Sequence, residues 1–368
     1  MSPTLTIGVL FGGRSGEHEV SLASARSVLS ALNRDKYRIV EIGITKTGVW
    51  LSGEGALDAL AAGRTEHLTP VTLLADPTRP GLRSLDEATA LSLLASLDVV
   101  FPVLHGTFGE DGTLQGLLEM AGVAYVGAGV AGSSVGMDKD LFKAVMRASG
   151  IPVVDWTILR RSEIEADIQG ALERIEKALD GFYPLFVKPA NLGSSVGISK
   201  CRSRSDLYEG LLEAARYDRR ILVEKGLNAR EIEVSVLGND EPAASIPGEI
   251  RPADEFYTYE AKYQDERSQL LIPAPLPEAL AEGLRRTAVA AYKAIDCAGM
   301  ARVDFLLDRE SGEYYLNEIN TLPGFTEISM YPKLWEASGL PYPRLLDRLI
   351  ALALERKRER DKTIYVRE

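Results

Sequence analysis

The chain has 368 residues, of which 45% are hydrophobic, and this size and composition suit two or three globular domains. Its 42 basic and 53 acidic residues give a net charge of −11, which argues against a nucleic acid or an anionic membrane as the main partner. The two cysteines and three histidines are scattered, which disfavours a disulfide framework, a zinc site and a histidine-based metal site. A signal-peptide pattern and an apolar run of membrane length are both missing, so we expect a cytoplasmic protein.

The N-terminal part predicts the opening of a doubly wound α/β sheet. A strand over residues 4–10 leads into the glycine loop FGGRSGEHEVS, a helix over 21–32 and a second strand over 37–44. The glycines do not form GxGxxG, so a dinucleotide site is poorly supported and a tight turn is the alternative. Glu17 precedes the helix, where a carboxylate is favoured by the helix dipole, so capping could explain one acid of this loop without any function.

A second glycine loop follows the buried strand expected at 99–103. Its sequence, HGTFGEDGTLQG, combines four glycines with His105, a glutamate and an aspartate, which is typical of a loop that lines a cleft. Taken alone, His105 would more often be structural. Two weakly amphipathic stretches within 51–97 suggest no chemistry. We place the first domain boundary near Gly129.

The middle of the chain contains a possible phosphate-binding flap. Strands are expected at 157–159 and 185–188, with a charged helix over 162–179 between them. The sequence VKPANLGSSVGISK then places Lys188 at the end of a strand, followed by a glycine- and serine-rich turn that includes Ser194 and Ser195. Backbone N–H groups and hydroxyls of such a turn can surround phosphate oxygens. The sequence is not a P-loop, and a simple hairpin is the alternative.

A possible adenosine pocket follows the strand expected at 221–224. Glu224 could accept hydrogen bonds from ribose hydroxyls, and the backbone groups of Lys225 and Leu227 could read the adenine edge. Glu231 and Glu233 begin the next strand, for which an edge strand with solvated charges is the alternative. Residues 249–271 form a long segment without a periodic pattern, and its three tyrosines favour a lid that orders over a ligand.

A strand pair near the C-terminus carries the clearest chemistry. Strands at 301–307 and 313–320 are joined by a short turn, and an antiparallel pairing would put one Arg, two carboxylates and one amide on the same face. Oxygen ligands of this kind hold Mg²⁺ against phosphates, and the Arg can bind a phosphate or an oxyanion. The alternative is an exposed sheet face with ordinary salt bridges. The four residues are Arg302, Asp304, Glu318 and Asn320.

Six motifs in a fixed order identify a family resemblance. They are GGxSxEHEVS, HGxxGEDGxxQ, VKPANxGSSVG, EAKY, ARVDF and NEINTLPGFT. Over about residues 7–343 the chain resembles the D-alanine–D-alanine ligases of the ATP-grasp superfamily. The resemblance implies an α/β fold of ATP-grasp architecture with an N-terminal Rossmann-like domain. The implied domains are 1–129, with the first D-alanine site, 130–235, with the glycine-rich flap, and 236–368, with the lid and the Mg²⁺ ligands.

The resemblance also implies a reaction and its participants. Two D-alanine molecules and ATP would yield D-alanyl-D-alanine, ADP and phosphate through an acyl phosphate, for peptidoglycan precursor synthesis, in an enzyme that is a homodimer. Two Mg²⁺ ions, which Mn²⁺ can replace, would be held by Asp304, Glu318 and Asn320. The residues implied to contact ATP are Lys139, Lys188, Ser195, Glu224, Lys225, Leu227 and Glu231.

The same resemblance assigns residues to the two amino-acid substrates. Glu17 would bind the ammonium of the first D-alanine, and Arg302 and the Gly324 N–H would bind the oxyanion. Lys262 would reach the transferred phosphate, while Tyr263 would hydrogen-bond to Ser194 and on towards Glu17. The residues implied to contact the second substrate or line the substrate site are His105, Ser329 and Met330.

Three other functions are weighed against this one. Another ATP-grasp carboxylate–amine ligase would share the phosphate chemistry and differ in its acceptor. A non-catalytic nucleotide-binding module would lack intact metal ligands, which this sequence retains. A nicotinamide oxidoreductase is disfavoured because GxGxxG and a ribose-reading acid after it are missing.

The lid tyrosine yields a first prediction. Similar ligases that make D-alanyl-D-lactate tend to have Phe where this chain has Tyr263, because a Tyr hydroxyl can keep an amine acceptor in place. Tyr263→Phe is therefore expected to raise the use of D-lactate relative to D-alanine as the pH falls. Product ratios measured with both acceptors test this, and an unchanged ratio would count against the role of Tyr263.

Overall fold

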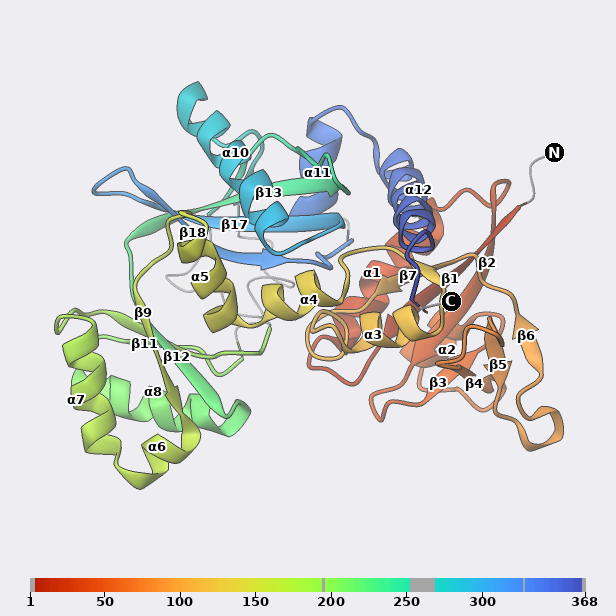
Figure 1. The fold of residues 1–368 in the computed structure, drawn as a ribbon, viewed down its shortest axis with the longest axis horizontal. Helices are drawn as coiled ribbons and strands as arrows, with labels where there is room; N and C mark the ends of the chain where they lie inside the picture. Colours follow the sequence, from red (N-terminus) through yellow and green to blue (C-terminus); the bar gives the residue numbers. More distant parts are fainter. Residues whose placement is uncertain (1–3, 194–195, 252–268, 327, 366–368) are drawn as a thin grey trace.

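The computed structural model describes residues 4–193, 196–251, 269–326 and 328–365. Within these ranges the chain forms three β-sheets, each accompanied by helices, as the α/β prediction required (Figure 1). The first sheet is built from the N-terminal third of the chain, the second from its middle and the third mostly from its C-terminal half. No helix within these ranges is both long and apolar enough to span a membrane.

The first sheet has a parallel centre with an antiparallel extension. β1 lies between β2 and β7 and is parallel to both, and β8 is parallel to β7. Four glycines and polar residues then follow β7, at the carboxyl edge where loops of parallel sheets form sites. The strands and helices are β1 (Leu5–Gly12), α1 (His18–Ala31), β2 (Tyr37–Ile44), β3 (Trp50–Ser52), α2 (Ala56–Ala61), β4 (Thr69–Leu73), β5 (Leu82–Ser84), the 3₁₀ helix η1 (Glu87–Thr89), β6 (Leu93–Ala95), β7 (Val99–Val103), α3 (Thr113–Met120) and β8 (Ala124–Tyr125).

The extension corrects the interpretation of residues 51–97 as two weakly amphipathic stretches. β3 pairs with the edge of β2, and β4, β5 and β6 are then added one after another, each to the strand before it; only α2 is an α-helix there. Strands of three to five residues are too short to show a clear alternation of polar and apolar side chains. Their pairing is decided by hydrogen bonding to the sheet edge and not by a local pattern.

The second sheet has four antiparallel strands in the order β11-β10-β12-β9. The charged helix expected over 162–179 is two helices, because Asp167 leaves helical geometry at φ −154° and its side chain accepts a hydrogen bond from Gly170 N at 2.9 Å. The elements are β9 (Trp156–Arg160), α6 (Arg161–Ala166), α7 (Ile168–Ala178), β10 (Leu185–Pro189), β11 (Ser199–Cys201), α8 (Arg204–Tyr217) and β12 (Arg220–Lys225).

The third sheet contains the strand pair that the sequence predicted. β17 and β18 are antiparallel, with Arg302 opposite Asn320 and Asp304 opposite Glu318, so all four side chains share one face. On the other face, helices α5 and α10 pack against an apolar core. The elements are α4 (Val130–Met137), α5 (Lys139–Ala148), β13 (Ala229–Gly238), β14 (Ala243–Ala244), β15 (Gly248–Arg251), β16 (Gln269–Leu271), α10 (Glu278–Ala294), β17 (Gly299–Asp308), β18 (Tyr314–Asn320), α11 (Met330–Ala337) and α12 (Tyr342–Arg360).

Two expectations for this region need correction. β13 lies between β15 and β17, so Glu231 and Glu233 are on an interior strand and not on a solvated edge. The segment 249–271 is not irregular at its ends, because β15 and β16 pair with each other there. The rest of the expected lid lies outside the described residues. The predicted domain limit at 235/236 falls inside β13, so the division into domains stays a prediction.

The last helix returns to the first sheet. α12 lies beside α1 and β7 in Figure 1, and its buried leucines share a core with Val99 and Phe101 of β7. Arg356 near its end stacks on the ring of Tyr125 at 4.2 Å. The chain therefore closes on its own beginning, which brings the loops after β18 next to the loops of the first sheet.

Candidate functional site

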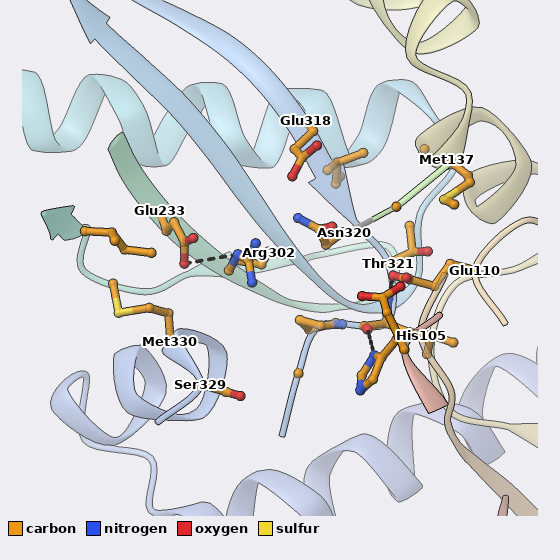
Figure 2. Close-up of a pocket in the computed structure, with 18 of the residues that line it drawn as sticks. His105, Glu110, Met137, Glu233, Arg302, Glu318, Asn320, Thr321, Ser329 and Met330 are labelled. Carbon is orange, nitrogen blue, oxygen red and sulfur yellow. Dashed lines mark hydrogen bonds and ion pairs between the residues drawn. The ribbon is translucent and has the colours of Figure 1, made fainter. Parts of the chain in front are cut away.

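One pocket collects segments from all three sheets. It has a volume of about 140 Å³ and is walled by the start of α1, the loop after β7, the start of α5, the turn after β10, the strands β13, β17 and β18, and the loop before α11 (Figure 2). Nine residues singled out from the sequence line it, although they are up to 313 positions apart. They are Glu17, His105, Lys139, Arg302, Glu318, Asn320, Gly324, Ser329 and Met330.

Glu17 stands at the start of α1 without capping it. The residue is the N-cap of the helix, but its side chain makes no capping hydrogen bond, and it is buried at the pocket wall. Gly106 leaves room for this carboxylate, because a Cβ there would lie 2.4 Å from Glu17 Oε2 and the backbone has a φ of +72°. Capping therefore does not explain Glu17. Its neighbour Glu19 instead forms an exposed ion pair with Lys46 at 2.7 Å.

His105 joins the first sheet to the loop after β18. Its Nδ1 lies 3.1 Å from the carbonyl oxygen of Leu322, and its Nε2 lies 3.2 Å from Ser24 Oγ. Burial lowers the pKa of His105 below its usual value, so the ring is neutral near pH 7. With both ring nitrogens engaged in protein contacts, the structural role that we considered is supported, and contact with a substrate remains a prediction.

Glu110 makes a second link between the same loops. Its carboxylate accepts hydrogen bonds from Gly106 N at 2.7 Å and from Leu322 N at 3.3 Å. Burial raises the pKa of Glu110 to about 8, and the charge of Glu17 adds to this effect. Two acids thus share one end of the pocket, and the electrostatics there favour keeping a proton on Glu110.

Arg302 is the centre of the charged wall of the third sheet. It donates two hydrogen bonds to Asp304, Nε to Oδ1 at 2.8 Å and Nη2 to Oδ2 at 2.7 Å, and its Nε lies 3.0 Å from Glu233 Oε2. Burial opposes its charge, but Asp304 and Glu233 outweigh burial and raise the pKa of Arg302 further above its usual value. Because these groups are largely buried in a pocket, the alternative of an exposed face with ordinary salt bridges is wrong.

The three predicted metal ligands are assembled on this wall. Asn320 Nδ2 donates to Asp304 Oδ2 at 3.0 Å, and Glu318 is directly opposite Asp304 on the neighbouring strand. Within the described ranges, no group of three or more His, Cys, Asp or Glu side chains is arranged to hold a metal. Two carboxylates and an amide nevertheless suit Mg²⁺, which takes few protein oxygens and completes its shell with water and substrate phosphates. The residues therefore fit the ion.

The loop before α11 forms the opposite wall. Ser329 is the N-cap residue of this helix, and its Oγ accepts a hydrogen bond from Thr326 N at 3.0 Å. Gly324 lies against it, since a Cβ at Gly324 would be 2.8 Å from Ser329 Oγ. Met330 is buried beside them at the first turn of the helix. A helix N-terminus with a hydroxyl is a favourable place for a carboxylate.

The predicted phosphate lysines come from different elements. Lys139, at the start of α5, donates from Nζ to the carbonyl of Leu192 at 2.6 Å, next to the glycine-rich turn. Lys188 on β10 forms an ion pair with Glu224 at 2.5 Å, and a third residue, Lys143 of α5, lies 2.8 Å from the same carboxylate. Glu224 is therefore enclosed by two ammonium groups.

The other residues expected to contact the nucleotide lie beyond this pocket. The side chain of Lys225 lies 3.3 Å from Asp155 Oδ2, and its backbone N–H donates to the Asp155 carbonyl at 3.1 Å. The expected contact of its backbone with adenine stays a prediction. Leu227 and Glu231 are partly buried, in the connection to β13 and on β13 itself. The predicted residues Ser194, Ser195, Lys262 and Tyr263 lie outside the described residues.

Three residues of the site were missed at the level of sequence. Glu110 lies in a loop whose many glycines and charges predicted that it lines a cleft, and Glu233 shares a strand face with Glu231. Both could therefore have been found from the sequence. Lys143 had none, because a lysine within an amphipathic helix is normally solvated. Its side chain is in fact only 2% exposed.

The comparisons with known sequences extend over nearly the whole chain. Residues 6–128 match the family model described as D-ala D-ala ligase N-terminus, and residues 145–351 match the model described as D-ala D-ala ligase C-terminus. The chain is 51% identical to a D-alanine–D-alanine ligase of Natranaerobius thermophilus over 97% of both chains. It is 52% identical to one of Heliobacterium modesticaldum over 97% of this chain and 96% of that one.

Solved structures give the same result. The D-alanine–D-alanine ligase from Coxiella burnetii has a TM-score of 0.81 and 40% identity, with 97% of both chains covered. The VanG D-Ala:D-Ser ligase from Enterococcus faecalis has a TM-score of 0.85 and 36% identity, covering 95% of this chain and all of that one. The whole arrangement of sheets, and not only one part, is thus shared with these enzymes.

The raised pKa of Glu110 predicts a pH-dependent stability. Between its usual value of 4.5 and the folded value of about 8, the folded protein keeps a proton that the unfolded chain releases. The free energy of unfolding therefore falls as the pH rises through this window. In Glu110→Gln, which has no titrating proton, this decline is expected to be smaller. Urea unfolding from about pH 5 to pH 8 measures it.

A surface acid provides the control for this experiment. Glu163 is exposed and pairs with Arg174, which lowers the pKa of Glu163, so the stability that it contributes is lost only below its usual value of 4.5. Glu163→Gln should therefore leave the slope between about pH 5 and pH 8 unchanged. Parallel profiles for wild type and Glu110→Gln would contradict the assignment of a retained proton to Glu110.

Proposed function

This chain belongs to the D-alanine–D-alanine ligase family, and on that premise we propose how the pocket of Figure 2 carries out the reaction. The protein is an ATP-dependent ligase that joins two D-alanine molecules into D-alanyl-D-alanine for peptidoglycan synthesis. The ATP-grasp fold and the ligase activity predicted from the six motifs are both confirmed. The observation that carries this conclusion is the identity of about 50% with ligases over nearly the full length of both chains.

The proposed reaction has two steps. A carboxylate is a poor acylating agent because an oxide is a very poor leaving group. An oxygen of the first D-alanine carboxylate therefore bonds to the γ-phosphorus of ATP as the bond to ADP breaks, which gives an acyl phosphate. The amine of the second D-alanine then attacks the carbonyl carbon, a proton leaves the nitrogen, and phosphate departs. Holding both amino acids in one pocket supplies a large part of the rate by proximity.

The first D-alanine would lie between Glu17 and Arg302. The buried carboxylate of Glu17 suits an ammonium group, and Arg302, on the other side of the pocket, suits the oxyanion that forms during attack. The N–H of Gly324 is the second candidate donor to this oxyanion. Asp304 and Glu233 hold the guanidinium in place beforehand, so little reorganisation is needed when charge develops.

The second D-alanine would enter from the side of α11. Its carboxylate would accept a hydrogen bond from Ser329 at the helix N-terminus, where the helix dipole favours negative charge. Met330 would limit the space for its side chain, and His105 would hold the loop that carries Leu322 and Gly324. For Ser194, Lys262 and Tyr263 the proposed roles rest on the resemblance in sequence alone.

ATP would bind with its phosphates at Lys139 and Lys188, under the turn that contains Ser195. Leu227 and Glu231 are proposed to hold adenine and ribose, with Lys225 and the backbone of Glu224 beside them, because both carboxylate oxygens of Glu224 are engaged by lysines. Both lysines are already engaged by oxygen atoms, Lys139 by a carbonyl and Lys188 by a carboxylate. Phosphate oxygens would therefore replace or join existing contacts of these side chains.

Asp304, Glu318 and Asn320 are proposed to hold two Mg²⁺ ions, or Mn²⁺ in their place. The bound ions would neutralise negative charge on the phosphoryl oxygens. In this structure Asp304 is oriented by Arg302 and Asn320, which keeps the carboxylate on the pocket face of β17. The same cluster thus positions a metal ligand and the oxyanion donor with one set of contacts.

Two further aspects complete the proposal. We propose a cytoplasmic location, where the co-substrate ATP is available. A homodimer, which the resemblance implied, can be tested by sedimentation.

A direct assay tests the function. The protein with D-alanine and Mg-ATP is expected to release one phosphate for each D-alanyl-D-alanine formed, as measured by phosphate detection and mass spectrometry. L-alanine is the control and should release little phosphate. Phosphate release without dipeptide, or efficient product formation only with D-serine or D-lactate, would contradict the proposed acceptor.

The metal assignment is tested by two substitutions. Asp304→Ala and Glu318→Ala are each expected to lower ATP turnover by at least about a hundredfold, since each removes an oxygen that the ions need. Circular dichroism should show an intact fold. Asp308→Ala, at the partly buried far end of the same strand, is the matched control and should keep its activity. Ordinary turnover in either of the first two variants would remove the metal assignment.

A further inference from the structure

A buried cluster of three charges lies where helix α5 meets the second sheet. Glu224 of β12 lies 2.5 Å from Lys188 Nζ through Oε1 and 2.8 Å from Lys143 Nζ through Oε2. The side chains of Lys143 and Glu224 are 2% and 3% exposed, whereas that of Lys188 is 13% exposed. One carboxylate therefore faces two ammonium groups, and of the two, Lys188 is the more accessible to a ligand.

Helix α5 fixes the position of Lys143. Its apolar residues Phe142 and Met146 are buried in the core of the third sheet, which turns Lys143 towards the second sheet. At the start of the helix, Arg220 of β12 pairs with Asp138 at 2.6 Å and also with Asp140. The ammonium of Lys143 is consequently held in place from both sheets.

The electrostatics show how the cluster divides its charge. Burial would raise the pKa of Glu224, but the charges of Lys143 and Lys188 outweigh burial and lower it to about 2, so the carboxylate is ionised. For Lys143, burial outweighs the attraction of Glu224, and its pKa is lowered. For Lys188, the nearby acids, Glu224 first among them, outweigh burial, and its pKa is raised. Counting Lys143 as an ammonium, since its Nζ lies 2.8 Å from the ionised Glu224, the three groups together carry one positive charge, and Glu231 and Glu318 act on Lys188 in addition.

We propose that Lys143 is a positioning residue for the nucleotide phosphates: it neutralises Glu224, so that the charge of Lys188 remains available to a phosphate oxygen. This inference rests on the proposed role of Lys188 as a phosphate ligand. Without Lys143, Glu224 and Lys188 would form a neutral buried pair. A phosphate would then have to compete with a carboxylate 2.5 Å away for the same ammonium, in surroundings where water screens charge poorly.

A purely structural role for Lys143 makes a different prediction. If Lys143 only fastened α5 to β12, its loss would disturb every part of a bound nucleotide and lower stability in parallel. If it balances the charge of Glu224, its loss should weaken the binding of phosphates and spare that of the nucleoside. The two cases can be separated by comparing ADP with adenosine.

The experiment uses the full-length protein and four variants at this cluster and beside it. Lys143→Met removes the charge, Lys143→Arg keeps it, and Lys143→Met combined with Glu224→Gln removes the cation and the anion together. Arg147→Met is the matched control, because Arg147 lies one turn further along α5 but is exposed and pairs only with Asp155 and the ring of Trp156 in the described structure. The measurements are kcat, the KM values for ATP and D-alanine, and inhibition constants for ADP and adenosine.

Lys143→Met is expected to raise the KM for ATP and the inhibition constant of ADP by about tenfold or more. The KM for D-alanine and the inhibition constant of adenosine should change by less than about threefold. Lys143→Arg and the double variant should each recover part of this loss, the double variant because Lys188 again carries the excess charge. Arg147→Met should behave like wild type. Melting curves establish that each variant is folded.

Three results would overturn the proposal. They are an ATP KM in Lys143→Met within about twofold of wild type, equal losses for ADP and adenosine, and a double variant no better than Lys143→Met. The double variant leaves no unpaired anion, so it keeps the test valid if Lys143→Met does not fold. Failure of the wild-type protein to ligate D-alanine would instead refute the proposed function, so the two failures are distinguishable.

Discussion

The contact between helix α5 and the second sheet depends on a buried carboxylate that is shared by two lysines. Glu224 binds Lys188 within the second sheet and Lys143 on α5, a helix whose apolar face belongs to the core of the third sheet. A buried carboxylate left without a cation would be strongly destabilising. These contacts therefore fix the position of α5 against the second sheet.

Paired charges also organise the charged wall of the third sheet. Arg302, Asp304 and Glu233 are paired with one another, so each is already oriented and desolvated before a substrate arrives. Donors fixed in advance stabilise developing charge without a cost of reorganisation, which is the main electrostatic contribution to catalysis. A buried Arg with two acids would be a poor choice for stability alone. Its proposed contact with the phosphate and the oxyanion would account for its presence in this pocket.

Closure of the chain on itself completes the site. His105 and Glu110, from the loop after β7, hold backbone groups of Leu322, more than 200 residues later in the chain. Helix α12 supports this contact, since its leucines share a core with β7. The loop that carries Gly324 is thus fixed by the first sheet, although it continues from a strand of the third. A domain that supplies only one side of the pocket could not position both substrates.

The sequence by itself determined the fold class and, through the resemblance carried by six motifs, the family and nine of the residues that line the pocket. Because side chains alternate along a strand, the sequence predicted that four polar side chains share one face of the sheet, and the strand register confirmed this. They are Arg302, Asp304, Glu318 and Asn320. Only the tertiary structure decided that β3 to β6 pair, that Glu224 is enclosed, and that Lys143 is buried. Their partners lie on other elements of the fold, and whether a lysine is solvated or inside depends on the surface that packs over it, which no local pattern contains.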